Sequence, residues 1–150
     1  MTTALKRRAP TPIFYNLAHL DIGAIPIVLQ DVKCSVDIAV LKQDTELVTR
    51  FLLSYKGSTA TFNAYRRELE RLCQWSWFLN ATSICKLTRD HIEEFIRFTL
   101  KPPKAWIGVK NVAGFMKRDG ERVPNPNWRP FVASDSKIDF ESGISPDTAK

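Results

Sequence analysis

The sequence predicts a mainly α-helical protein with irregular ends. Between Asp44 and Leu100, apolar residues recur with helical spacing in three segments, and each segment starts at a residue type that commonly caps helices. All nine prolines lie outside this region, so the flanking segments are expected to be less regular. A chain of 150 residues has room for one domain with long flanking segments, and not for two full-sized domains.

The N-terminal arm, residues 1–43, has no clear periodicity. Its apolar residues are interrupted by Gly23 and Pro26 and include two short β-favouring runs, 25–29 and 36–41. We expect either an extended arm that packs on the domain or one or two short strands.

The first predicted helix begins at Asp44, a suitable N-cap, and places Glu46 near the positive end of the helix dipole. Gly57 is expected to stop this helix at its C-terminal end. The apolar stripe of the helix consists of Leu47, Val48, Phe51, Leu52 and Tyr55.

The second predicted helix begins at Ser58 as its N-cap and runs for roughly five to six turns. Its apolar stripe consists of Phe62, Tyr65, Leu69, Leu72 and Leu79, widened by Cys73 and Trp75. The opposite, polar face holds Asn63, Arg66, Arg67, Glu70, Arg71 and Gln74.

The third predicted helix follows a loop at about 80–86 and begins at Thr88 as its N-cap. Pro102 and Pro103 are expected to end it, because proline cannot continue a helix. The apolar face of this helix consists of Ile92, Phe95, Ile96 and Leu100.

The segment 104–131 is rich in Pro, Gly, Lys and Trp and lacks helical periodicity. Residues 119–120 (Asp-Gly) and 124–127 (Pro-Asn-Pro-Asn) are turn signals, so we expect a hairpin or a basic loop. The last residues, 132–150, are expected to form a flexible tail or a cut linker.

The charge distribution favours a polyanionic partner. The net charge is +6, and the excess lies in the first nine residues and in 101–130, where seven Lys and Arg accompany two acids. Nucleic acid is the usual partner of such a pattern. The alternative is that a basic surface only keeps the protein soluble.

Several function classes lack support in the sequence. Phosphate-binding, nucleophile-elbow and zinc-protease motifs are absent, and His19 and His91 belong to no recognisable dyad. The three cysteines have no metal-binding spacing, so we expect reduced thiols and neither a metal nor a cofactor. No apolar run is long enough to span a membrane, and we expect a cytoplasmic protein with no membrane partner.

A more specific pattern spans the second and third predicted helices. It reads Ser58-x2-Thr61-x3-Tyr65-x3-Leu69-x2-Leu72-x2-Trp75, followed by Leu87-Thr88 and Asp90-x-Ile92. This pattern resembles the core-binding domain of tyrosine recombinases and phage integrases, whose chains read S-x-x-T-x-x-x-Y-x-x-x-L-x-x-F-x-x-W and then L-T-x-x-D-I. Here Leu72 stands where Phe is usual, and His91 lies between Asp90 and Ile92. Because several matched positions are apolar, a generic helical bundle is the alternative.

The resemblance implies a small helical, SAM-like core-binding domain at 44–131, with a basic insertion from about 101, like one found in some integrases. In the family, two further helices close this domain. A second domain supplies an Arg, a Lys, a His-x-x-Arg and a nucleophilic Tyr, and none of these can be placed here. The resemblance therefore implies a partial recombinase that binds double-stranded DNA and has no catalytic residues or enzymatic activity of its own. Other integrase protomers are a further candidate partner.

The resemblance also implies that helices cross the major groove and that their ends hold phosphates. Free backbone amides at a helix N-terminus favour a phosphate, and basic side chains add sequence-independent affinity. The candidate DNA-binding residues are Lys56, Ser58, Thr59, Thr61, Asn63, Arg66, Arg67, Arg71, Lys104, Lys110, Lys117 and Arg118. For any one of them, a solvated surface is an equal alternative. Trp106 and Trp128 either stack on exposed bases or pin the basic segment to the helices.

The predicted function is DNA binding as the N-terminal part of a site-specific recombinase. The alternatives are a helical protein-interaction module, whose open apolar face takes a partner or a second copy, and a decayed integrase remnant.

Overall fold

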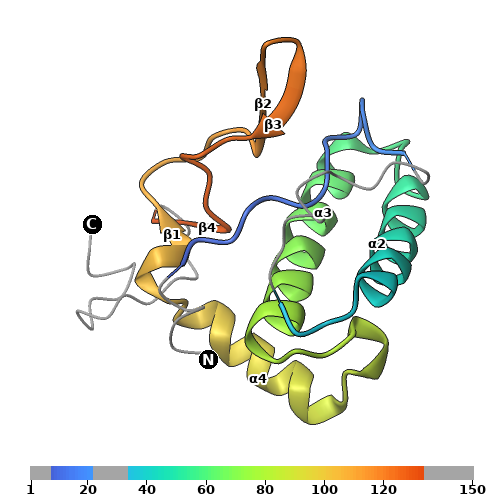
Figure 1. Cartoon of the computed structure of the whole chain (residues 1–150), viewed down its shortest axis with the longest axis vertical. Coiled ribbons are helices and arrows are strands. Elements are labelled where there is room, and N and C mark those ends of the chain that lie inside the picture. The colour runs from blue at the N-terminus through green and yellow to red at the C-terminus, as the bar shows by residue number, and fades with distance from the viewer. Residues whose placement is uncertain (1–7, 22–33, 134–150) are drawn as a thin grey trace.

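The computed structural model describes residues 8–21 and 34–133 (Figure 1). Three α-helices dominate this part of the chain, as the sequence predicts, and small strands follow them. The α-helices are α2 (Ile38–Leu53), α3 (Thr59–Gln74) and α4 (Arg89–Leu100). A π-helical turn, Trp75–Leu79, extends α3, and short 3-10 turns occupy Ile84–Lys86 and Lys104–Trp106. The strands are β1 (Ile107–Gly108), β2 (Phe115–Arg118), β3 (Glu121–Pro124) and β4 (Phe131–Val132).

The start of α2 differs from the prediction. The helix begins at Ile38, after Asp37 as its N-cap, so the prediction of Asp44 as N-cap is wrong. The end of the β-favouring run 36–41 is helical because Leu41 packs in the core with Val48, and such packing outweighs a weak local propensity. The segment 25–29 lies outside the described residues.

The other end of α2 also differs. The last helical residue is Leu53, four positions before Gly57, and the chain passes from one to the other in turns. Gly57 therefore lies between the two helices and does not end the first one. The predicted stripe is only partly covered, because Val48 and Leu52 are buried whereas Phe51 is exposed.

Asp44 is a buried acceptor inside α2. Its carboxylate accepts hydrogen bonds from the indole Nε1 of Trp77 at 2.9 Å, from Ser83 Oγ at 2.9 Å and from the backbone N–H of Ile84 at 3.0 Å. One side chain thus joins α2 to the end of the second helical segment and to the loop after it.

The caps of α3 and α4 are confirmed. Ser58 Oγ accepts from the backbone N–H of Thr61 at 3.4 Å. Thr88 caps α4, and the Nδ1 atom of His91 accepts from the Thr88 backbone N–H at 3.0 Å. This reciprocal capping box satisfies donors that the first turn of a helix leaves without partners.

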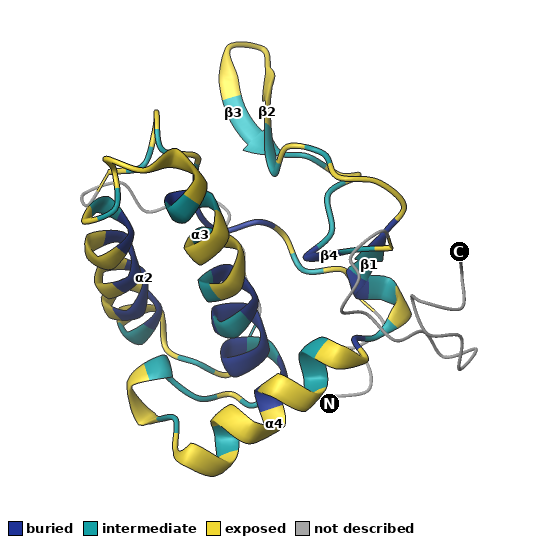
Figure 2. Cartoon of the chain, turned by 180° about the vertical axis from the view of Figure 1, so that it is seen from behind, coloured by how far each residue is buried: buried dark blue, intermediate teal, exposed yellow. Residues whose placement is uncertain are grey.

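The apolar face of α4 is mostly open. Of the four residues predicted on it, only Phe95 is buried, while Ile92, Ile96 and Leu100 are 38%, 53% and 47% exposed. Figure 2 shows most of α4 as exposed. Among the described residues, nothing covers this stripe.

Two apolar clusters hold the described part together. The first joins α2 and α3 to the N-terminal arm, and the second joins α3 and α4 to the segment 104–132. The first contains Ile13, Phe14, Leu41, Val48, Leu52, Phe62, Cys73 and Trp77. The second contains Trp75, Leu79, Phe95, Trp106 and Phe131. Over residues 8–21 the arm packs on the helices and forms no strand, with a turn at 17–19, and residues 22–33 lie outside the described part.

A hairpin forms in the segment after α4, in agreement with the sequence. Strands β2 and β3 pair antiparallel, and the turn between them has positive φ at Asp119 (53°) and Gly120 (81°). Two consecutive positive φ values are typical of the tight hairpin turn that Asp-Gly favours. The hairpin projects away from the helices (Figure 1), while β1 and β4 pair in parallel at its base.

Within 8–21 and 34–133, no helix has the length and apolar character needed to cross a membrane.

Candidate nucleic-acid interface

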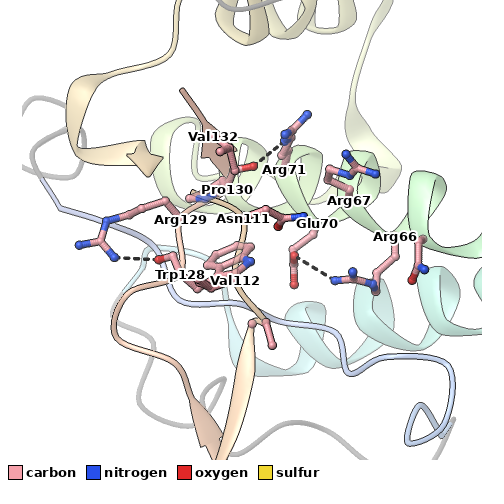
Figure 3. A pocket seen from close by; sticks show the side chains of 13 residues that line it. Arg66, Arg67, Glu70, Arg71, Asn111, Val112, Trp128, Arg129, Pro130 and Val132 are labelled. Atoms are coloured by element: carbon pink, nitrogen blue, oxygen red, sulfur yellow. Dashed lines mark hydrogen bonds and ion pairs between the residues drawn. The ribbon is translucent and has the colours of Figure 1, made fainter. Parts of the chain in front are cut away.

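A hollow of about 470 Å³ lies between α3 and the segment after α4 (Figure 3). Its α3 wall carries Asn63, Arg66, Arg67, Glu70 and Arg71. The facing wall is formed by residues 111–114 and by Trp128, Arg129, Pro130 and Val132. The hollow is open on one side, so a ligand can enter from solvent.

A second hollow, of about 270 Å³, lies beside the first. The arm contributes Phe14, Tyr15, Asn16 and His19, and the hairpin contributes Phe115, Met116, Lys117 and Arg122. Both hollows are lined by Arg66, Ala113 and Gly114, so they adjoin at these residues. We refer to the two hollows together as the cleft.

The cleft is strongly basic. Its lining includes six positively charged residues, Arg66, Arg67, Arg71, Lys117, Arg122 and Arg129. Glu70 is the one acidic residue among the described residues that line it. A concave surface lined by charges of one sign concentrates counter-ions of the opposite sign. The cleft is therefore suited to an anion or a polyanion.

Glu70 is buried and anchors the arm. Its Oε2 atom accepts hydrogen bonds from the backbone N–H groups of Ile13 at 2.6 Å and Phe14 at 3.0 Å. Burial raises the pKa of the Glu70 carboxyl, against the opposing effects of Arg66 and the two amide donors. Since its other oxygen lies 3.8 Å from Arg66 Nη1, Glu70 neutralises only part of the charge in the cleft.

Arg71 is also buried, and its hydrogen bonds serve the fold. Its Nε donates to the carbonyl of Pro130 at 2.8 Å, and its Nη1 lies 2.9 Å from the carboxylate of Glu68. The guanidinium carbon lies 4.3 Å from the centre of the Phe131 ring. Arg71 therefore connects the segment after α4 to α3. It also adds a positive charge to the lining of the cleft.

The polar face of α3 is thus covered over much of its length. Gln74 is fully buried and donates to the carbonyl of Thr11 at 2.8 Å, in line with the contacts of Glu70 and Arg71. The arm and the segment 128–132 pack against this face and cover part of it. Arg67, which is exposed and makes no hydrogen bond or ion pair within the described residues, is the most accessible arginine of that face.

Five of the predicted DNA-binding residues line the cleft, namely Asn63, Arg66, Arg67, Arg71 and Lys117. Lys56, Ser58, Thr59 and Thr61 lie together at the start of α3, outside the cleft lining. Lys104, Lys110 and Arg118 are exposed and also lie outside it. The structure therefore brings only part of the predicted set together in the cleft.

Other cleft residues carry no clear signal in the sequence. His19 and Tyr15 belong to the arm, where no pattern distinguishes them, yet Arg122 Nη2 lies 3.0 Å from His19 Nδ1 and its guanidinium lies 5.2 Å from the Tyr15 ring. Asn111 and Trp128 come from opposite ends of the segment after α4. The described residues contain no group of His, Cys, Asp and Glu that would hold a metal ion.

No family model, curated protein or solved structure matches this chain.

Proposed function

We propose that this chain is a cytoplasmic DNA-binding protein that acts as the N-terminal part of a site-specific recombinase of the tyrosine-recombinase type. One observation carries the DNA-binding part: a cleft lined by six basic side chains and a single buried acid, between α3 and the segment after α4. Neutralising backbone phosphates releases counter-ions, and this supplies most of the sequence-independent affinity of DNA-binding proteins.

Two further surfaces support contact with a duplex. The N-terminus of α3 carries exposed Ser58 and Thr59 beside Lys56, and backbone amides at such an end favour a phosphate. The hairpin presents Lys117 and Arg118 as exposed residues, and a two-stranded ribbon fits the major groove. In this proposal, DNA lies along the cleft between the start of α3 and the hairpin.

The recombinase part rests on the spacing of polar and apolar residues in α3 and at the start of α4. The polar members of that pattern include Ser58, Thr61 and Thr88, and of these Ser58 and Thr88 are helix N-caps. We also propose that α2, α3 and α4 are the helices of a SAM-like core-binding domain. Within the described residues the catalytic set of the family has no counterpart, so this chain is proposed to bind and not to cleave DNA.

Equilibrium binding to a labelled duplex of about thirty base pairs across a salt series tests the proposal. Changing Lys117 and Arg118 together to Gln is expected to reduce the slope of log affinity against log salt by about 0.9 for each lost phosphate contact. Arg97→Gln, on an exposed part of α4 outside the cleft lining, is the matched control. A slope equal to that of the unchanged protein would contradict a role for the hairpin, and no binding at low salt would contradict the proposal.

A protein-interaction module is the second candidate, and the open stripe on α4 favours it. Ile92, Ile96 and Leu100 recur every four residues and form an apolar surface on one side of the helix. If a second copy of the chain covers this stripe, sedimentation will show a dimer, and Ile96→Ser will return it to the monomer. A monomer at all concentrations, with DNA binding, would exclude this self-association.

A further inference from the structure

We infer that the cleft takes unpaired nucleotides, so that single-stranded nucleic acid binds in it more tightly than a duplex does. This inference rests on the proposed nucleic-acid binding and names the form of its ligand. It follows from the size of the cleft, from its aromatic side chains and from the position of its free arginine donors.

The first argument is size. The larger hollow, of about 470 Å³, is in the range of sites that enclose a small organic ligand, and the smaller hollow, of about 270 Å³, adjoins it. A duplex is far wider, since its major groove alone measures about 12 Å across. A duplex can rest on the rim of the cleft, whereas a single strand can enter it with base, sugar and phosphate.

The second argument concerns the aromatic rings that line each hollow. Trp128 lines the larger hollow and is only half-buried. Tyr15 and Phe115 line the smaller hollow and pack edge to face, with ring centres 4.6 Å apart. Bases of a single strand stack on such rings, while in a duplex their faces are already covered by neighbouring bases.

Trp128 is the stronger of these stacking positions. Within 8–21 and 34–133, no other aromatic ring packs against its indole. Its Nε1 atom lies close to Gly114, where an added Cβ would be 3.6 Å away. The half-buried side chain of Trp128 therefore keeps part of its surface available to a base.

The third argument is the placement of arginine donors in the same cleft as the aromatic rings. Arg66 lies where the two hollows adjoin, and its buried Nε has no hydrogen-bond partner among the described residues. Arg67 lines the larger hollow and has no partner in the same part of the chain. Arg67 is exposed, so its donors can reach a phosphate oxygen directly, whereas the Arg66 Nε has almost no exposed surface and needs a shift of the side chain to do so.

The basic residues and the aromatic rings together match what is needed to bind a single strand independently of its sequence. A positively charged groove follows the backbone, and aromatic side chains take successive bases. Arginines alone are enough to bind the phosphates of a duplex, and half-buried aromatic rings inside a hollow add nothing to that contact. The aromatic rings therefore decide in favour of an unpaired strand.

Fluorescence anisotropy with the full chain tests the inference. The probes are a labelled oligothymidine of about fifteen nucleotides, the matching oligouridine, and a labelled duplex of equal length. We expect at least one single strand to bind about 10-fold more tightly than the duplex, and the two oligomers to show whether DNA or RNA is preferred. Equal or tighter binding of the duplex would overturn the inference and leave the proposed DNA binding intact, whereas the absence of binding to all three would overturn both.

Variants of the cleft localise the binding. Trp128→Leu is expected to weaken single-strand binding about 10-fold and to weaken duplex binding less, while Trp128→Phe retains most of the single-strand affinity. Arg67→Gln, at an exposed position where the fold is not at risk, is expected to weaken single-strand binding, and Arg97→Gln is not. Unchanged single-strand affinity in both Trp128→Leu and Arg67→Gln would place the ligand elsewhere and contradict the inference.

Discussion

Replacing Asp44 with alanine is expected to lower the free energy of unfolding by about 3–4 kcal/mol. The carboxylate accepts from Trp77 Nε1, Ser83 Oγ and the Ile84 backbone N–H, and alanine would leave these three donors without their acceptor. Each unsatisfied buried donor costs about 1–3 kcal/mol, and the indole of Trp77 is fully buried. Urea unfolding followed by tryptophan fluorescence measures the loss.

Asp37 provides the matched control for Asp44. It lies at the N-cap of the same helix, but its side chain makes no capping hydrogen bond, so Asp37→Ala is expected to cost less than about 0.5 kcal/mol. Asp44→Asn keeps one acceptor oxygen and is expected to fall between the two. Equal losses in Asp44→Ala and Asp37→Ala would show that the buried network contributes no net stability.

Replacing Glu70 with alanine is expected to destabilise the protein by about 2–4 kcal/mol. The change removes the acceptor of the Ile13 and Phe14 backbone N–H groups, which hold the arm on α3. Glu70→Gln keeps one acceptor oxygen and is expected to lose less. Limited proteolysis within the arm, measured with urea unfolding, distinguishes release of the arm from a general loss of stability.

Glu70 is also expected to make the free energy of unfolding depend on pH. The pKa of Glu70 is raised in the folded protein, chiefly by burial, above its usual value of 4.5. Between the usual and the raised pKa, the folded state binds more protons than the unfolded state, so the contribution of Glu70 to stability falls as pH increases and levels off above the raised pKa. The difference in stability between the unchanged protein and Glu70→Gln should follow this change, and a difference independent of pH would contradict it.

The parts of the fold that depend on neighbouring residues could be predicted from the sequence. Ser58 and Thr88 cap helices through atoms three residues away, and the Asp119-Gly120 turn depends on the φ values that these two residues tolerate. The role of Asp44 could not be predicted in this way. An aspartate before an apolar run suits a cap, whereas here Asp44 is a buried acceptor for donors that lie 33 to 40 positions later.

The candidate site was predictable to a similar degree. Helical spacing correctly placed Arg66 and Arg67 on one face of α3, and composition indicated that the segment after α4 was basic. Spacing could not show that the arm covers part of this face, because residues 8–21 have no periodic pattern and bind through backbone groups. A backbone N–H carries no signature in the sequence, so the contacts of Glu70 and Gln74 with the arm could not be foreseen.

The anchoring of the arm by Glu70 also sets an order of events during synthesis. Phe14 leaves the ribosome 56 residues before the carboxylate that binds its amide. At about 5–20 residues per second, this separation corresponds to about 3–11 s of translation. During that interval Ile13 and Phe14 can pack on α2 but not yet on the complete α3, so their backbone N–H groups still lack the Glu70 acceptor. Residues 13 and 14, made before all three helices, thus reach their final contacts only after α3 has been made.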